Sequence, residues 1–236
     1  MGYIAEFKGW SDLSLEDLVV AYRKAKADCF FENTFPAAIK FAEFEQDLYA
    51  NLARLRENII TNQGFSENTD FLGSYRLLPK KLVVEPNSKM KKAHIHFSNP
   101  TRAFESLTKN NTLVPEFRVV ADFPVEAHIL SALWINMVGH KFDASLDDSC
   151  YGARLKRIRN DETLDPSAAK PFHISSIGSF TPYFGPYQSW RNDGLNAIRG
   201  ELEKERNVIA ASLDLKGYYH SIDPKALASE GLHQEL

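Results

Sequence analysis

The stretch VIAASLDLKGYYHSID, from Val208 to Asp223, decides how the rest of the chain is interpreted. Its first six residues are almost all apolar or β-branched, which predicts a buried strand that ends at Asp214. Gly217 then permits a turn, and Asp223 followed by Pro224 is typical of the start of a helix. The predicted order is strand, carboxylate, turn, aromatic pair and helix.

A carboxylate at the end of a buried strand needs an ion pair or a bound cation, because a lone charge is costly to bury. Mg²⁺ is usually held by one or two protein carboxylates together with substrate phosphates, so this pattern is compatible with nucleotidyl transfer. An Asp beside a turn is also often a solvated or capping residue. The residues alone leave both interpretations open.

The decapeptide DLKGYYHSID resembles motif A of reverse transcriptases, a palm signature in which two aromatic residues follow an Asp, and group II intron enzymes carry a close variant. The resemblance implies that Asp214 is catalytic and a ligand of Mg²⁺, with the backbone carbonyl of Leu215 as a second ligand. It places Tyr219 beneath the sugar of the incoming nucleotide. The implied two-metal site would be completed by residues outside this chain.

The block FRVVADFP, from Phe117 to Pro124, is similar to the fingers strand of retroviral reverse transcriptases, which reads WRKLVDF. In that family the Arg binds the triphosphate of the incoming nucleotide, and Arg118 occupies the matching position. A guanidinium is always charged and offers a planar set of donors for phosphate oxygens. The alternative is a surface Arg that pairs with a neighbouring acid such as Glu116.

A basic segment lies inside an acidic chain. Residues 1–70 hold 7 Lys and Arg against 12 Asp and Glu, a net charge of −5, whereas residues 71–118 hold 9 against 3, a net charge of +6. Short β-type runs at Leu82–Val84 and His94–Phe97 predict a hairpin around Pro86. Five lysines lie in or beside this predicted hairpin: Lys80, Lys81, Lys89, Lys91 and Lys92. They either protect a strand edge or contact nucleic-acid phosphates.

The sequence CYGARLKR, from Cys150 to Arg157, resembles the SYGFR motif of group II intron enzymes, and Arg154 matches its Arg, which implies a nucleic-acid contact. The family pattern is then interrupted by residues 158–190, an insertion rich in Pro, Gly and aromatic residues. Its aromatics could stack on bases or form a compact cap on the core. A helix is predicted from Asp193 to about Arg206.

Other helices are predicted from caps and apolar spacing. Ser14 reads as the N-cap of a helix that runs to about Asp28, and a single long helix is expected from Pro36 to about Thr61. A third helix is predicted after Pro124, and its predicted core face consists of Ile129, Leu133, Met137 and Val138.

Composition sets the class of protein. The 236 residues are 44% hydrophobic and 25% charged, with a net charge of −3, as in an ordinary globular protein. The N-terminus lacks the apolar region of a signal peptide and no long apolar run occurs, so a cytoplasmic protein without a membrane partner is expected. Two cysteines are too few for a thiolate metal site.

Together the motifs predict an α+β protein: a helical N-terminal region (1–70), fingers with a basic β-hairpin (71–157), the insertion (158–190) and the start of a polymerase palm (191–236). The right-hand fold is incomplete, since motif C, an aromatic residue followed closely by two aspartates, does not occur. The resemblance implies part of an RNA-directed DNA polymerase of a bacterial antiphage defence system, inactive alone, whose partners are an RNA template, dNTPs and a DNA product.

The alternative is a non-catalytic RNA-binding or scaffold module with a polymerase-like shell. The sequence leaves open whether a structured non-coding RNA or a partner protein is also required.

Overall fold

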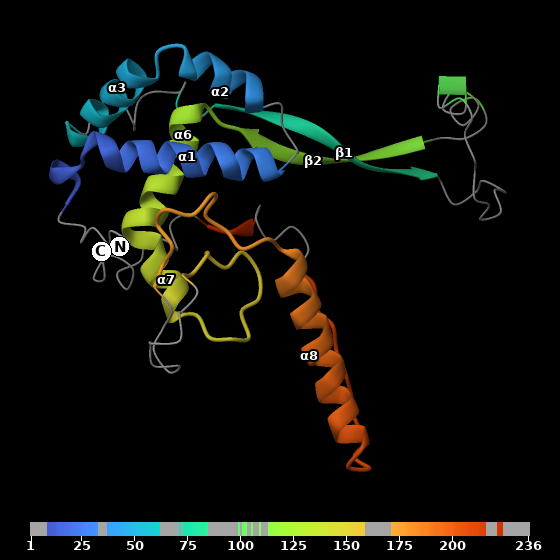
Figure 1. The fold of residues 1–236 in the computed structure, drawn as a ribbon. Helices are drawn as coiled ribbons and strands as arrows, with labels where there is room; N and C mark the ends of the chain where they lie inside the picture. The colour runs from blue at the N-terminus through green and yellow to red at the C-terminus, as the bar shows by residue number, and fades with distance from the viewer. Residues whose placement is uncertain are drawn as a thin grey trace.

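The computed structural model describes residues 9–32, 37–61, 71, 73–84, 99, 101, 102, 105, 109, 113–158, 171–215 and 221–223, with the backbone alone at 32, 37, 81–84 and 113–115. Helices and a two-stranded antiparallel sheet make up this part of the chain, which confirms the predicted α+β class. Figure 1 shows a helical body, a long β-ribbon that extends from it, and a helix that projects in another direction. None of the described helices is both long and apolar enough to cross a membrane.

The first long helix, α1 (Leu15–Glu32), begins at the predicted cap. The Ser14 hydroxyl accepts a hydrogen bond from the Asp17 backbone N–H at 3.1 Å, and the Asp17 carboxylate accepts one from the Ser14 backbone N–H at 2.9 Å. These reciprocal bonds satisfy donors that a helix start leaves open, and the acids of the first turn favour the positive end of the helix dipole.

The single helix predicted for Pro36 to Thr61 is wrong, because two helices occupy this region: α2 (Ala37–Glu45) and α3 (Leu48–Ile60). The Asn51 side chain donates a hydrogen bond to the Phe44 carbonyl at 2.9 Å, and Asp47 adopts a non-helical conformation. The break therefore satisfies a carbonyl at the end of α2. Apolar spacing continues across it because both helices contribute buried residues to one core.

The hydrophobic core lies where α1 crosses α6 (Val125–Trp134), as Figure 1 shows. Leu18, Ile129 and Leu133 are 0% exposed. Burying each such side chain stabilises the fold by about 1.5–3 kcal/mol relative to exposure. The core face predicted for the third helix is confirmed, and α1 and α6 share one core across the boundary predicted at residue 70.

A π-helical turn, η2 (Ile135–Gly139), joins α6 to α7 (His140–Ser145). A Cβ atom on Gly139 would lie 2.5 Å from Cζ3 of Trp134, so glycine leaves room for the indole ring. That ring stacks on Phe142 with 6.1 Å between centroids. Such wide turns place an extra residue in the helix, and they occur often at functional sites.

The β-ribbon consists of β1 (Ser74–Val84) and β2 (Leu113–Asp122), which pair antiparallel from Ser74 opposite Asp122 to Val84 opposite Leu113. The register shifts between Pro79 and Lys81, where a proline without an N–H interrupts the ladder. The predicted pairing within residues 73–100 is therefore corrected: the partner of β1 is the strand that carries FRVVADF. Residues 94–97, the other predicted strand, lie outside the described residues.

Within the region predicted as an insertion, residues 171–180 contact α1 and the chain at residues 155–157. Leu155 pairs with Phe180 and Arg157 pairs with Phe172 in isolated bridges, and Phe172 and Ser179 are buried. The helix α8 (Phe184–Leu202) begins well before the predicted Asp193. Pro186 falls in its first turn, where the missing N–H would have no helical partner, so this proline does not break the helix.

The buried strand predicted for Val208–Leu213 is wrong. Residues 206–215 have no regular secondary structure, and Ile209 and Leu213 are 99% and 92% exposed. The chain reverses after α8, where the Arg206 backbone N–H donates to the Glu201 carbonyl at 3.1 Å (Figure 1). An apolar run becomes a buried strand only when a sheet covers it, and the described residues supply no sheet besides β1–β2. No palm sheet is therefore present in this part of the chain.

Candidate functional site

The β-ribbon presents Arg118 to solvent. Arg118 is exposed on β2 opposite Leu78, and no described acidic side chain forms an ion pair with it. The neighbour considered as its partner, Glu116, instead lies 3.6 Å from Nζ of Lys80. The alternative considered for Arg118, an ion pair with Glu116, is therefore not formed.

The predicted lysine cluster is only partly described. Lys80 is exposed at the register shift, and the backbone of Lys81 pairs with Glu116. The other three lysines lie outside the described residues: Lys89, Lys91 and Lys92. The ribbon itself therefore carries basic side chains in the strands as well as in the segment that connects them.

An ion triad at the base of the ribbon was not anticipated from the sequence. Nζ of Lys40 and Nε of Arg76 lie 2.7 Å and 2.8 Å from the two carboxylate oxygens of Asp122, which is 12% exposed. The hydrogen bond from Lys40, followed by that from Arg76, holds the pKa of Asp122 below its usual value despite opposition from partial burial. The triad ties α2 to both strands, and Lys40 is too distant along the chain for any local motif to reveal it.

A cleft of about 1030 Å³ opens beside this triad. Its walls come from α1, the start of α2, the base of the ribbon, the first residues of α6, and the segment that leads into α8. Aromatic side chains line much of it, together with a few charged groups. Neither Arg118 nor Asp214 is among the residues that line it.

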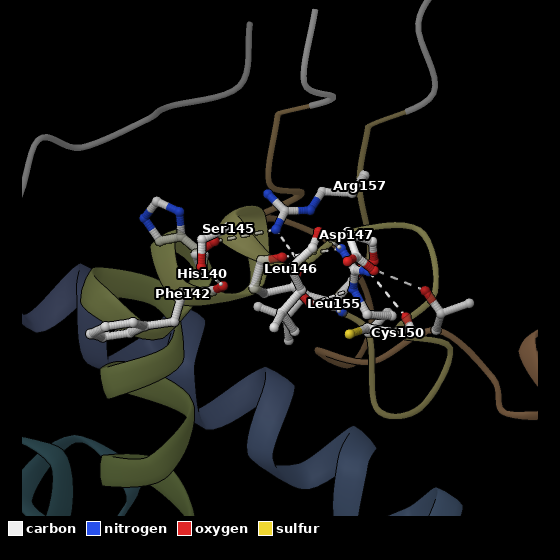
Figure 2. A network of polar contacts seen from close by, with 11 residues as sticks. His140, Phe142, Ser145, Leu146, Asp147, Cys150, Leu155 and Arg157 are labelled. Atoms are coloured by element: carbon white, nitrogen blue, oxygen red, sulfur yellow. Dashed lines mark hydrogen bonds and ion pairs between the residues drawn. The ribbon is translucent and has the colours of Figure 1, made fainter. Parts of the chain in front are cut away.

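Arg154, the predicted nucleic-acid contact, is instead engaged by the protein itself. Nε donates to the Asp143 carboxylate at 3.0 Å, and its terminal amino groups donate to four backbone carbonyls around residues 143–150. These five contacts match the five N–H donors of a guanidinium. Figure 2 shows the polar network of this loop, with Leu146, Asp147 and Cys150 labelled. Arg154 thus shapes this loop, and its donors are occupied within the protein.

Asp143 is the centre of that network. Its carboxylate is 8% exposed and also accepts hydrogen bonds from Arg157 and from the Leu155 backbone N–H. Burial alone would raise the pKa of Asp143, but the bonds from Arg157, Leu155 and Arg154 outweigh burial and lower it. The guanidinium groups of Arg154 and Arg157 on this one buried carboxylate fix α7 against the chain that carries YGAR.

A buried lysine holds the segment after residue 170 on α1. Lys24 is 1% exposed; its Nζ donates to the His173 carbonyl at 3.3 Å and lies 4.0 Å from the Phe172 ring centroid. Asp28, one helical turn later, accepts a hydrogen bond from the Ser179 backbone N–H at 2.8 Å. Burial lowers the pKa of Lys24 to about 8, with Asp28 opposing and Lys156 reinforcing the change.

The motif A residues are placed only in part. Asp214 and Leu215 are exposed, while Tyr218 and Tyr219 lie outside the described residues. Among the residues that the structure does describe, no three His, Cys, Asp or Glu side chains lie close enough together to hold a metal ion. Asp214 offers one carboxylate, and a site for two Mg²⁺ ions requires further ligands beside it.

Comparison with known proteins gives no relative: no family model, curated protein or solved structure matches this chain. The functional argument therefore depends on the motifs and on the geometry of the described residues.

Proposed function

We propose that this chain is the fingers and motif A part of an RNA-directed DNA polymerase, a reverse transcriptase of a bacterial antiphage defence system that acts in the cytoplasm. The observation that carries the proposal is Arg118. It lies solvent-exposed on a β-ribbon, in the strand FRVVADF whose sequence resembles the fingers strand of reverse transcriptases. The proposed substrates are an RNA template and dNTPs, and the proposed product is DNA.

The order of elements supports the same proposal. The ribbon is followed by α6, by the YGAR loop, by α8 and then by SLDLKGYYHSID, the order in which the resembling motifs occur. Each motif is short, and their succession over about 150 residues carries more weight than any of them alone. The absence of a palm sheet from the described residues weighs against an active chain in this form.

In the proposed enzyme Arg118 would bind the triphosphate of the incoming nucleotide through parallel N–H donors. The basic side chains of the ribbon would bind backbone phosphates, and Tyr219 would lie under the sugar. Asp214 and the Leu215 carbonyl would hold Mg²⁺, which when bound stabilises the charge that develops during nucleotidyl transfer.

A non-catalytic RNA-binding module is the second candidate, and one observation favours it. Asp214 lies on an exposed, irregular segment, and a metal site requires a rigid arrangement of several ligands. Such a module would bind RNA through the ribbon without synthesising DNA.

The test is primer extension on an RNA template by the complete protein of the parent gene, with dNTPs and Mg²⁺. We expect Asp214→Asn to abolish incorporation and to leave RNA affinity and thermal stability unchanged. Asp148→Asn is the matched control, since Asp148 is another exposed aspartate outside the proposed site, and it should retain full activity. Undiminished synthesis by Asp214→Asn would refute the assignment of Asp214 as the catalytic metal ligand. RNA binding by a wild type that incorporates no nucleotide would establish the module.

A further inference from the structure

The cleft beside the ion triad exposes five aromatic side chains. Phe31 is 63% exposed, Phe123 41%, Phe180 40%, Tyr183 66% and Phe184 63%, and all five line the cleft. An aromatic side chain is mostly apolar and is usually covered. Exposed aromatic rings in a groove are side chains on which proteins stack nucleic-acid bases.

These rings converge from three separate parts of the chain. Phe31 belongs to the end of α1, Phe123 follows β2, and the others lie in the turn before α8 and at its first residue. Their meeting is thus a property of the tertiary fold. The Tyr183 and Phe184 rings stack on each other, with centroids 4.1 Å apart and a tilt of 31°, so the outer face of this pair offers one wall to a planar group.

Three cations and two carboxylates line the cleft, and this excess of positive charge favours an anion next to that planar group: Lys40, Arg76, Lys156, Asp28 and Asp122. Lys40 and Arg76 share the single carboxylate of Asp122, which leaves the triad with one positive charge in excess. Both cations are more than one third exposed, at 36% and 41%, and Asp122 fixes their positions. A guanidinium and an ammonium held together suit the oxygens of one phosphate.

We propose that this cleft binds a nucleotide unit, with the base against the Tyr183–Phe184 wall and the phosphate at Lys40 and Arg76. The volume of about 1030 Å³ is at the upper end of ordinary ligand pockets. The unit is either a free nucleoside monophosphate or an unpaired nucleotide of an RNA strand. The site is separate from Arg118 and Asp214, and it shares with the proposed function only the premise that the chain binds nucleotides.

The experiment measures binding to the full chain by isothermal titration calorimetry. The probes are AMP, UMP and a hexamer of uridylate, with adenosine and ribose 5-phosphate as partial ligands that lack the phosphate or the base. We expect AMP, the hexamer or both to bind at least tenfold more tightly than either partial ligand. Binding by AMP identifies the free nucleotide as the source, and binding by the hexamer alone identifies the strand.

Two variants test the geometry against a matched control. Phe184→Ala should weaken binding about 5-fold to 150-fold, the usual range for losing one base-stacking ring. Arg76→Gln should reduce the advantage of AMP over adenosine. Trp190→Ala should bind like the wild type, because Trp190 is a 52% exposed aromatic of the same helix that does not line the cleft.

Absence of binding by every mononucleotide and by the hexamer overturns the inference, and so does an equal loss in Trp190→Ala and Phe184→Ala. The result is distinguishable from failure of the polymerase proposal. Asp214→Asn should leave binding in the cleft unchanged whether or not the complete protein synthesises DNA.

Discussion

The burial of Lys24 predicts that the chain becomes more stable as the pH rises from 8 to 9.5. The pKa of Lys24 is lowered from its ordinary 10.5 to about 8, chiefly by burial. In this pH range the unfolded chain therefore binds more protons than the folded one. Stability increases with pH wherever the unfolded state holds the larger number of protons.

The size of the effect follows from the two pKa values. A difference of about 2.5 corresponds to roughly 3 kcal/mol of destabilisation when Lys24 is charged in both states, at about 1.4 kcal/mol for each pKa unit. Half of this penalty, about 1.5 kcal/mol, is relieved between pH 8 and 9.5, since the folded lysine loses its proton first. Below pH 8 the whole penalty applies.

Urea unfolding followed by circular dichroism at several pH values measures this change. Lys24→Met keeps the aliphatic stem and removes the charge, so its stability should not show the rise of about 1.5 kcal/mol. The scan should end below pH 10, because burial and the hydrogen bond to Glu45 raise the pKa of Tyr22 and add a second titration there. A wild type whose stability is flat from pH 8 to 9.5, or a variant with the same slope, would show that Lys24 is not charged and buried as described.

Three further predictions concern the network, the π turn and the ribbon. Asp143→Asn should lower the free energy of unfolding by about 3–5 kcal/mol, because two guanidinium groups lose a buried carboxylate. Asp122→Asn should lower it by about 1 kcal/mol or less, because the partners of Asp122 are well exposed. The contribution of Asp143 should be lost as the pH falls below its ordinary pKa, and urea titrations at pH 7 and pH 3 of wild type and variant check the sign. Gly139→Ala should cost about 1 kcal/mol and shift the tryptophan fluorescence, because its Cβ would displace the ring of Trp134 from Phe142; an unchanged spectrum contradicts this. Lys89, Lys91 and Lys92 lie in the sequence between β1 and β2. Replacing all three with Gln should make the salt dependence of RNA binding shallower, and an unchanged slope would mean that they only solubilise the ribbon.

Local signals in the sequence predicted local structure well. The Ser14 cap and the apolar face of α6 are confirmed, because each depends on residues within a few positions along the chain. Apolar spacing cannot predict the break at Asp47, because the spacing runs through it. The bond from Asn51 to Phe44 and the non-helical conformation of Asp47 show where α2 ends.

Long-range features were beyond sequence reasoning. The pairing of β1 with β2 depends on contacts between strands that are separated by 28 residues, whereas spacing along the chain favours the nearer β-type run His94–Phe97. The Asp122 triad and the Asp143 network each join charged groups from separate elements. Composition alone predicts burial for the apolar run before Asp214. This run is exposed, because composition cannot supply the sheet that would cover it.

The packing of α1 on α6 has a consequence for synthesis of the chain. Leu15 and Val125, the first residues of the two helices, are 110 positions apart. At about 5–20 residues per second, α1 leaves the ribosome roughly 5–20 s before its main partner does. During that interval α2 and α3 are the described helices, among those already synthesised, that can cover the apolar face around Leu18. Nascent chains that stall before Trp134 should therefore be the ones that recruit chaperones or aggregate, whatever the folded protein binds.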